Sequence, residues 1–118
     1  MTYDPNNIFA RIIRGELPAK KIYEDEFALA FHDLYPKKKI HALVIPKGAY
    51  VSLADFITAP ASVQQGFWQA VKKVSRYLGV EQSGYRLITN HGQDGHQEVP
   101  HFHIHLLGGE STGPLVAK

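Results

Sequence analysis

The feature that most limits how this chain can fold is an alternation near its carboxyl end, the run HFHIHL at residues 101–106. Successive side chains of a β-strand point to opposite faces of its sheet. A strand over residues 101–107 would therefore send Phe102, Ile104 and Leu106 into a core and three imidazoles to the other face. Threonine or lysine would cover a solvated face equally well, so the histidines indicate a functional site.

Hydrophobic periodicity predicts two helices. The first is expected to begin at Asp4 and Pro5, a common cap and first residue, and to end near Gly15. The second is expected to run from a cap at Thr58 to Gly79. Its core-facing stripe consists of Val63, Phe67, Ala70, Val71, Val74 and Leu78.

Segments rich in β-forming residues predict five strands. Pro46 is expected to stop the third strand, and residues 90–98 form a polar, glycine-bearing loop before the fifth. The order α-β-β-β-α-β-β predicts an α+β fold, a five-stranded antiparallel sheet that carries two helices. We expect one domain over residues 1–118, of which about 110–118 form a tail. The predicted strands are residues 20–24, 27–33, 41–45, 84–89 and 101–107.

Composition narrows the class of protein. Of the 118 residues, 44% are hydrophobic and 20% are charged, as in a globular domain. The formal charge of +2 is too small to predict a nucleic-acid binder. No signal peptide and no membrane span are expected, so we predict a cytoplasmic protein. The chain has no cysteine, which excludes thiolate zinc sites and cysteine nucleophiles.

Three imidazoles on one strand face suit two kinds of chemistry. They could bind zinc, with a water molecule as the remaining ligand. Alternatively, one imidazole could attack an electrophile while its neighbours fix its tautomer. The preceding loop offers donors for an oxyanion, among them Asn90 and Gln97, and few carboxylates that could orient zinc-bound imidazoles. The residues alone favour phosphoryl chemistry and leave a zinc hydrolase as the alternative.

The spacing of several blocks is similar to one known family. Asn90, Gly95, Gln97 and Val99 precede the run HFHIHLLG at residues 101–108 as they do in the histidine triad signature. The chain thus resembles the histidine triad superfamily, and within it the Hint branch, over about residues 7–109. Agreement among so many blocks is far more specific than a lone HxHxH. The upstream blocks are NIFARII at 7–13, LPA at 17–19, AFHD at 30–33 and HALVIPK at 41–47.

The resemblance implies an assembly and a reaction. Family members are homodimers whose two five-stranded sheets join into one ten-stranded sheet. The Hint branch hydrolyses purine nucleoside phosphoramidates, in which AMP or GMP is linked to an amine, and requires neither cofactor nor metal. By this likeness His103 attacks phosphorus, and water cleaves the resulting nucleotidyl-histidine intermediate. The backbone carbonyl of His101 would hold the Nδ1 proton of His103, His105 would contact the phosphate or the bridging atom, and His41 would support proton transfer.

The resemblance also implies which residues bind the nucleotide. Asp33 would bind the ribose hydroxyls, whereas Asn90 and Gln97 would lie on the phosphate side. Without the resemblance, a turn would explain Asp33 equally well, and the apolar residues would be expected to pack in the core. The purine pocket would be lined by Phe9, Leu17, Phe31 and Leu34, with His32 beside it.

Three features depart from the family pattern. Glu98 stands where animal Hint enzymes carry serine, and His96 where they carry glycine. The tail at 110–118 lacks the tryptophan-containing end of those enzymes, so the preference for the leaving group is open. Two alternatives also stay open. One is a nucleotide-binding interaction module with vestigial hydrolysis, and the other is a dinucleoside polyphosphate hydrolase.

Overall fold

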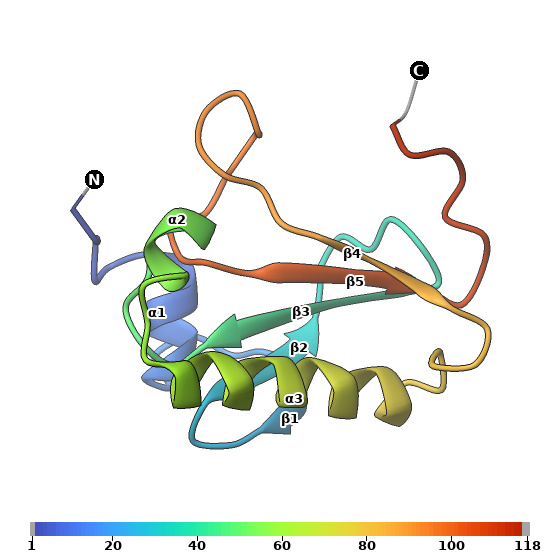
Figure 1. Ribbon diagram of the computed structural model, residues 1–118, viewed down its shortest axis with the longest axis horizontal. Helices are drawn as coiled ribbons and strands as arrows, with labels where there is room; N and C mark the ends of the chain where they lie inside the picture. Colours follow the sequence, from blue (N-terminus) through green and yellow to red (C-terminus); the bar gives the residue numbers. More distant parts are fainter. Residues whose placement is uncertain (1, 117–118) are drawn as a thin grey trace.

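The computed structural model describes residues 2–116; Met1, Ala117 and Lys118, and the parts of the predictions that include them, lie outside it. Its centre is a five-stranded antiparallel sheet in the order β1-β2-β3-β5-β4 (Figure 1), which confirms the predicted fold class. The strands are β1 (Lys21–Glu24), β2 (Ala28–His32), β3 (Ile40–Pro46), β4 (Tyr85–Ile88) and β5 (Ile104–Gly108). The helices are α1 (Ile8–Ile13), α2 (Leu53–Phe56) and α3 (Ala61–Tyr77).

One face of the sheet packs against α3, which lies along it in Figure 1. The helix contributes most of the predicted stripe as buried residues, including Phe67 and Val74. Small side chains at Ala28, Ala30 and Ala42 face it from β2 and β3, so that the helix can lie close to the sheet. This packing forms the larger of the two apolar clusters found within residues 2–116.

The opposite face packs against α1. Leu29, Phe31 and Leu43 point to this side because side chains alternate along each strand. They meet Phe9 and Ile12 of the helix in a second apolar cluster. Since α1 has only six residues, it covers part of this face and leaves the rest available for a site.

Both predicted helix starts were wrong. α1 begins at Ile8, where the side chain of Asn7 accepts a hydrogen bond from the Ala10 N–H at 2.9 Å, while Asp4 holds the preceding turn through the Asn6 N–H. Thr58 lies in the turn just after α2, a short helix that the sequence did not predict, and its hydroxyl donates to the Asp55 carbonyl. The first residue of α3 follows Pro60.

The fifth strand begins three residues later than predicted, because residues 101–103 lie outside the ladder with β3. Pro46, at the facing end of β3, has no N–H with which to extend that ladder. The N–H of Phe102 instead donates to the Tyr50 carbonyl at 2.7 Å. Alternation nevertheless continues, since Phe102 joins the α3 cluster while His101 and His103 lie beside Phe9. The predicted separation of the two faces is confirmed.

Beyond β5, the described part of the tail has no regular element and is attached to β4 by one side chain. The Arg86 guanidinium donates to the carbonyls of Thr112, Gly113 and Pro114 at 3.4, 2.8 and 3.0 Å. This clamp fixes the course of the tail next to the edge strand of the sheet. No helix within residues 2–116 combines the length and apolar character needed to cross a membrane.

Candidate active site

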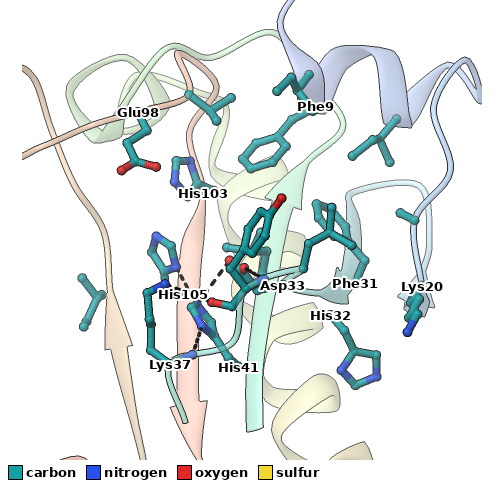
Figure 2. A pocket seen from close by; sticks show the side chains of 18 of the residues that line it. Phe9, Lys20, Phe31, His32, Asp33, Lys37, His41, Glu98, His103 and His105 are labelled. Carbon is teal, nitrogen blue, oxygen red and sulfur yellow. Dashed lines mark hydrogen bonds and ion pairs between the residues drawn. The ribbon is translucent and has the colours of Figure 1, made fainter.

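A cavity of about 580 Å³ opens on the sheet face that α1 leaves uncovered (Figure 2). This volume lies within the range of roughly 300–1,000 Å³ that is usual for small-molecule sites. Segments far apart in the sequence meet there: α1, the end of β2, the start of β3, the loop after β4, and β5 with its lead-in. The predicted site residues that line it are Phe9, Phe31, His32, Asp33, Leu34, His41, Asn90, His103 and His105.

The ring of His103 has one nitrogen fixed by the backbone. Its Nδ1 lies 2.7 Å from the carbonyl oxygen of His101. A carbonyl oxygen only accepts, so Nδ1 carries the proton and donates it. Nε2 of the neutral ring is then unprotonated, and its lone pair lies on the far side from the anchored nitrogen. Phe9 packs edge-to-face on the ring at 5.0 Å between centroids, which restricts its orientation.

His41 and His105 form a second fixed arrangement. The Lys37 N–H donates to His41 Nδ1 at 3.1 Å, so a neutral His41 carries its proton on Nε2. That Nε2 lies 3.0 Å from His105 Nδ1 and 3.5 Å from Asp33 Oδ2. His41 therefore donates to His105, whose own proton is then on Nε2. This series of hydrogen bonds ends at the Nε2–H of His105, a donor on a residue that lines the cavity.

Burial keeps these imidazoles uncharged near neutral pH. It lowers the pKa of His103, against smaller opposing effects of the His101 carbonyl, Asp33 and Glu98. Burial first, and the neighbouring His103 and His41 next, lower the pKa of His105 to about 4. Burial also lowers the pKa of His41, which Asp33 partly offsets. An anion bound in the cavity would raise all three pKa values, because it stabilises the charged rings.

The apolar end of the cavity lies under α1. The rings of Phe9 and Phe31 pack edge-to-face at 5.6 Å and are only 7% and 4% exposed. Leu34, 76% exposed, and the exposed His32 lie at the rim. Figure 2 shows Asp33 between Phe31 and the two coupled histidines, and its Oδ1 accepts the Tyr35 N–H at 2.8 Å. The cavity thus has an apolar end and an imidazole end with a carboxylate between them.

Comparison with known proteins identifies the family. The family model of the HIT domain matches residues 14–112. A 13.2 kDa HIT-like protein of Azospirillum brasilense is 52% identical over 118 residues, which cover 99% of this chain and 97% of that protein. The chain belongs to the HIT family. The resemblance drawn from the sequence is therefore confirmed.

Two further relatives of this HIT protein bear on its class. The purine nucleoside phosphoramidase of Escherichia coli K12 is 36% identical over 110 residues, 93% of this chain and 92% of that protein. A solved HIT family hydrolase from Clostridium thermocellum has a TM-score of 0.87 at 39% identity, over 95% of this chain and 97% of the other. These similarities support the assignment of the chain as a HIT family hydrolase.

Three predicted site residues of the HIT protein lie behind the cavity wall. His101 is fully buried, its Nε2 donates to the Pro46 carbonyl at 2.9 Å, and its backbone carbonyl is the group that reaches His103. The Gln97 amide bonds to the backbone of its own loop and to the carbonyl of residue 51. Leu17 packs against the α1 cluster. The three residues therefore support the site from outside.

Sequence reasoning missed two contributors to the HIT site. Lys37 acts through its backbone N–H, which selects the tautomer of His41 and has no signature in the side-chain pattern. The hydroxyl of Tyr3 lies 2.7 Å from Nδ1 of His101, 98 residues along the chain. Only the fold brings these two residues together. Asn90 was predicted, but its Nδ2 donates to the Gly95 carbonyl at 2.6 Å, so it also braces the loop.

The residues that could bind zinc in the structure differ from the three strand histidines that the sequence suggested. Both ring nitrogens of His101 are already hydrogen-bonded, so the three strand histidines do not form a metal site together. Asp33, His41 and His105 do offer ligand atoms within 4.8 Å of one another. The proton on His41 Nε2, which the Lys37 N–H places there, accounts for this approach as a hydrogen bond. The contact between His41 and His105 is therefore a hydrogen bond between two neutral rings.

Proposed function

We propose that this HIT protein hydrolyses purine nucleoside phosphoramidates, cleaving the P–N bond between a nucleoside monophosphate and an amine. The observation that carries the proposal is the 2.7 Å bond from His103 Nδ1 to the His101 carbonyl. It leaves Nε2 of a buried, uncharged imidazole as a nucleophile beside a cavity. The similarity to the Escherichia coli purine nucleoside phosphoramidase supports the substrate class.

The two ends of the cavity suit the two ends of a nucleotide. The purine packs between Phe9, Phe31 and Leu34, where burial of an aromatic ring is favourable. Asp33 accepts hydrogen bonds from the ribose hydroxyls, since an ionised carboxylate only accepts. The phosphoryl group then reaches His105, whose Nε2–H donates to a phosphoryl oxygen.

The reaction runs in two displacements at phosphorus. In the first, the lone pair of His103 Nε2 attacks, the P–N bond breaks, and its electron pair leaves with the amine. The nucleotidyl-histidine that forms is cationic on the ring, because Nδ1 keeps its proton. The His101 carbonyl, which accepts that proton in a hydrogen bond, stabilises the charge. In the second displacement water attacks phosphorus and releases the nucleoside monophosphate and free His103.

The leaving amine needs one proton, and the coupled His41 and His105 can hold it. Both rings are uncharged in the empty site, and the negative charge of the phosphoryl group raises their pKa values. The pair therefore takes up one proton together with the substrate. His105 passes it to the nitrogen as the P–N bond breaks and later takes a proton from the attacking water. No proton is gained or lost over a full cycle.

The decisive experiment incubates the purified protein with adenosine and guanosine 5′-phosphoramidates and measures nucleotide release. An enzyme turns over many equivalents per subunit, also in the presence of EDTA. An interaction module with vestigial hydrolysis would bind AMP and release less than one equivalent. Diadenosine tetraphosphate serves as the competing substrate, and faster cleavage of it than of any phosphoramidate would replace the proposal. Loss of activity in EDTA would restore the zinc alternative.

We infer that two copies form the dimer that the resemblance implies, with β4 at the junction of the two sheets. β4 is an edge strand of the five-stranded sheet, so one of its sides is not paired within residues 2–116. Its Tyr85 and Leu87 are 38% and 39% exposed. Light scattering should give twice the 13.2 kDa of one chain. A monomer at micromolar concentration would contradict the inference.

Glu98 gives a prediction about the leaving group. It lines the cavity beside His103 in Figure 2 and acts on the charge of that ring. Within residues 2–116 its carboxylate has no hydrogen bond or ion pair that would neutralise it. A carboxylate at the mouth of the cavity attracts a substrate whose amine part carries a positive charge and repels one whose amine part carries a negative charge. We therefore expect kcat/KM to be about fivefold higher for an AMP–ethylenediamine conjugate than for AMP–β-alanine at low salt.

The Glu98→Gln variant tests this preference because it removes the charge at nearly constant shape. Its two kcat/KM values should become equal within about twofold, and high salt should have the same effect on the wild type. Glu26→Gln, an exposed carboxylate in the turn before β2, is the matched control and should keep the preference. Wild-type protein that does not discriminate between the two conjugates would contradict the role of Glu98.

A further inference from the structure

Tyr3 lies before α1, yet its side chain reaches the histidine run at the other end of the chain. Its hydroxyl is 2.7 Å from Nδ1 of His101, and the two rings pack edge-to-face at 5.7 Å between centroids. The other ring nitrogen of His101 donates to the Pro46 carbonyl, so Nδ1 of this neutral ring carries a lone pair. Tyr3 is therefore the donor in this bond.

The bond matters because of where the His101 carbonyl points. That carbonyl holds the Nδ1 proton of His103, and it belongs to a segment without ladder hydrogen bonds. The N–H of the same peptide group, that of Phe102, is fixed by the Tyr50 carbonyl. Farther along the segment, the Thr89 hydroxyl donates to the His103 carbonyl at 2.9 Å, and the ring of Phe102 is buried. The ring of His101 is a further anchor, on the residue that carries the carbonyl itself, and it is held at both nitrogens.

We propose that Tyr3 is a positioning residue for the reaction: through the His101 ring it holds the carbonyl that orients His103. The proposal rests on the proposed function for its effect on turnover. The hydrogen bonds of the His101 and His103 rings are present in the free protein, so they do not depend on the identity of the substrate. Tyr3 touches neither the substrate nor the reacting atoms, and it does not line the cavity.

A purely structural role for Tyr3 makes a different prediction. If the hydroxyl only attached the amino-terminal segment to the core, its loss would lower thermal stability and leave the chemistry unchanged. If it positions the catalytic ring, its loss also allows the His101 peptide to move, so that His103 presents its lone pair in the wrong direction for part of the time. The chemical step then slows while nucleotide binding stays as it was.

The test compares Tyr3→Phe with Tyr23→Phe, which also removes a hydrogen-bonded hydroxyl but away from the cavity. The Tyr23 hydroxyl donates to Asp25 at 2.8 Å and accepts from the Lys73 ammonium at 3.3 Å. We expect Tyr3→Phe to lower kcat for an adenosine phosphoramidate by about three- to tenfold, the size of one neutral hydrogen bond, with KM within twofold of wild type. Tyr23→Phe should keep both values. Tyr3→Phe with wild-type kcat would overturn the proposal.

Nitrogen-15 and proton NMR of the histidine rings gives a second readout that needs no turnover. In wild-type protein, Nδ1 of His101 should show the shift of an unprotonated, hydrogen-bonded nitrogen, and the Nδ1 proton of His103 should exchange slowly. In Tyr3→Phe the first signal should move to that of a free nitrogen, and the second should exchange faster. An unchanged His103 proton would overturn the positioning role. A wild type without turnover would reject the proposed function alone.

Discussion

His103→Ala should lower the kcat for an adenosine phosphoramidate by at least about a thousandfold, because the variant has no group that can form the nucleotidyl-enzyme bond. The binding of AMP should be retained. His103 is 5% exposed and the purine end of the cavity is built from other residues, so the Kd for AMP should change by less than about tenfold. Nucleotide release in single-turnover and steady-state assays measures the first effect, and calorimetry measures the second.

A histidine outside the cavity provides the control for this experiment. His91 is exposed, its Nδ1 lies 2.8 Å from the hydroxyl of Ser52, and it does not line the cavity. His91→Ala should therefore hydrolyse the substrate at the wild-type rate. A trapped nucleotidyl-protein should form with the wild type and with His91→Ala, and be absent from His103→Ala. Hydrolysis by His103→Ala at a rate near that of the wild type would remove the nucleophile from the proposed mechanism.

Phe102→Ala should lower the free energy of unfolding by about 3–5 kcal/mol, the range for removing a fully buried phenyl ring. Phe102 is 1% exposed, and its ring centroid lies 4.6 Å from that of Phe56, on which it stacks, and 5.6 Å from that of Phe67. Its removal therefore leaves a cavity that the neighbours fill poorly. Urea denaturation followed by circular dichroism measures the loss. Because the residue lies between His101 and His103, activity should fall as well.

Two other substitutions provide reference values for this loss of stability. Phe102→Leu keeps most of the apolar volume and should cost about 1 kcal/mol. Tyr77→Ala removes an aromatic ring that is 75% exposed and should change stability by less than about 0.5 kcal/mol. If Phe102→Ala proved no more damaging than Phe102→Leu, the ring of Phe102 would not be packed between Phe56 and Phe67.

Sequence patterns predicted the fold because each signal was local. The stripe on α3 and the period-two alternation of β2, β3 and β5 decide which side chains meet the helices, and the structure follows them. The start of α1 was less predictable. Asp4 and Asn7 are both good caps, and the choice depended on a turn in which Asn7 donates to the Asp4 carbonyl. α2 was missed because four residues carry too little periodicity.

The site was predictable as far as its side chains show in the sequence. His103, His105, His41 and Asp33 meet at one cavity as the resemblance implied. The groups that select their tautomers could not be predicted, because two of them are backbone atoms, the Lys37 N–H and the His101 carbonyl. Backbone donors and acceptors occur at almost every residue, so only coordinates identify the ones that matter.

The Arg86 clamp has a consequence for which substitutions the tail of this protein can tolerate. The guanidinium binds three main-chain oxygens in a row, so it recognises the path of the tail and not the identity of its side chains. The path does place a conformational demand on Gly113, whose φ of +80° suits a residue without Cβ. Leu115 and Val116 just beyond it, 87% and 72% exposed, are free to be exchanged for other residues without detaching the segment from the sheet edge.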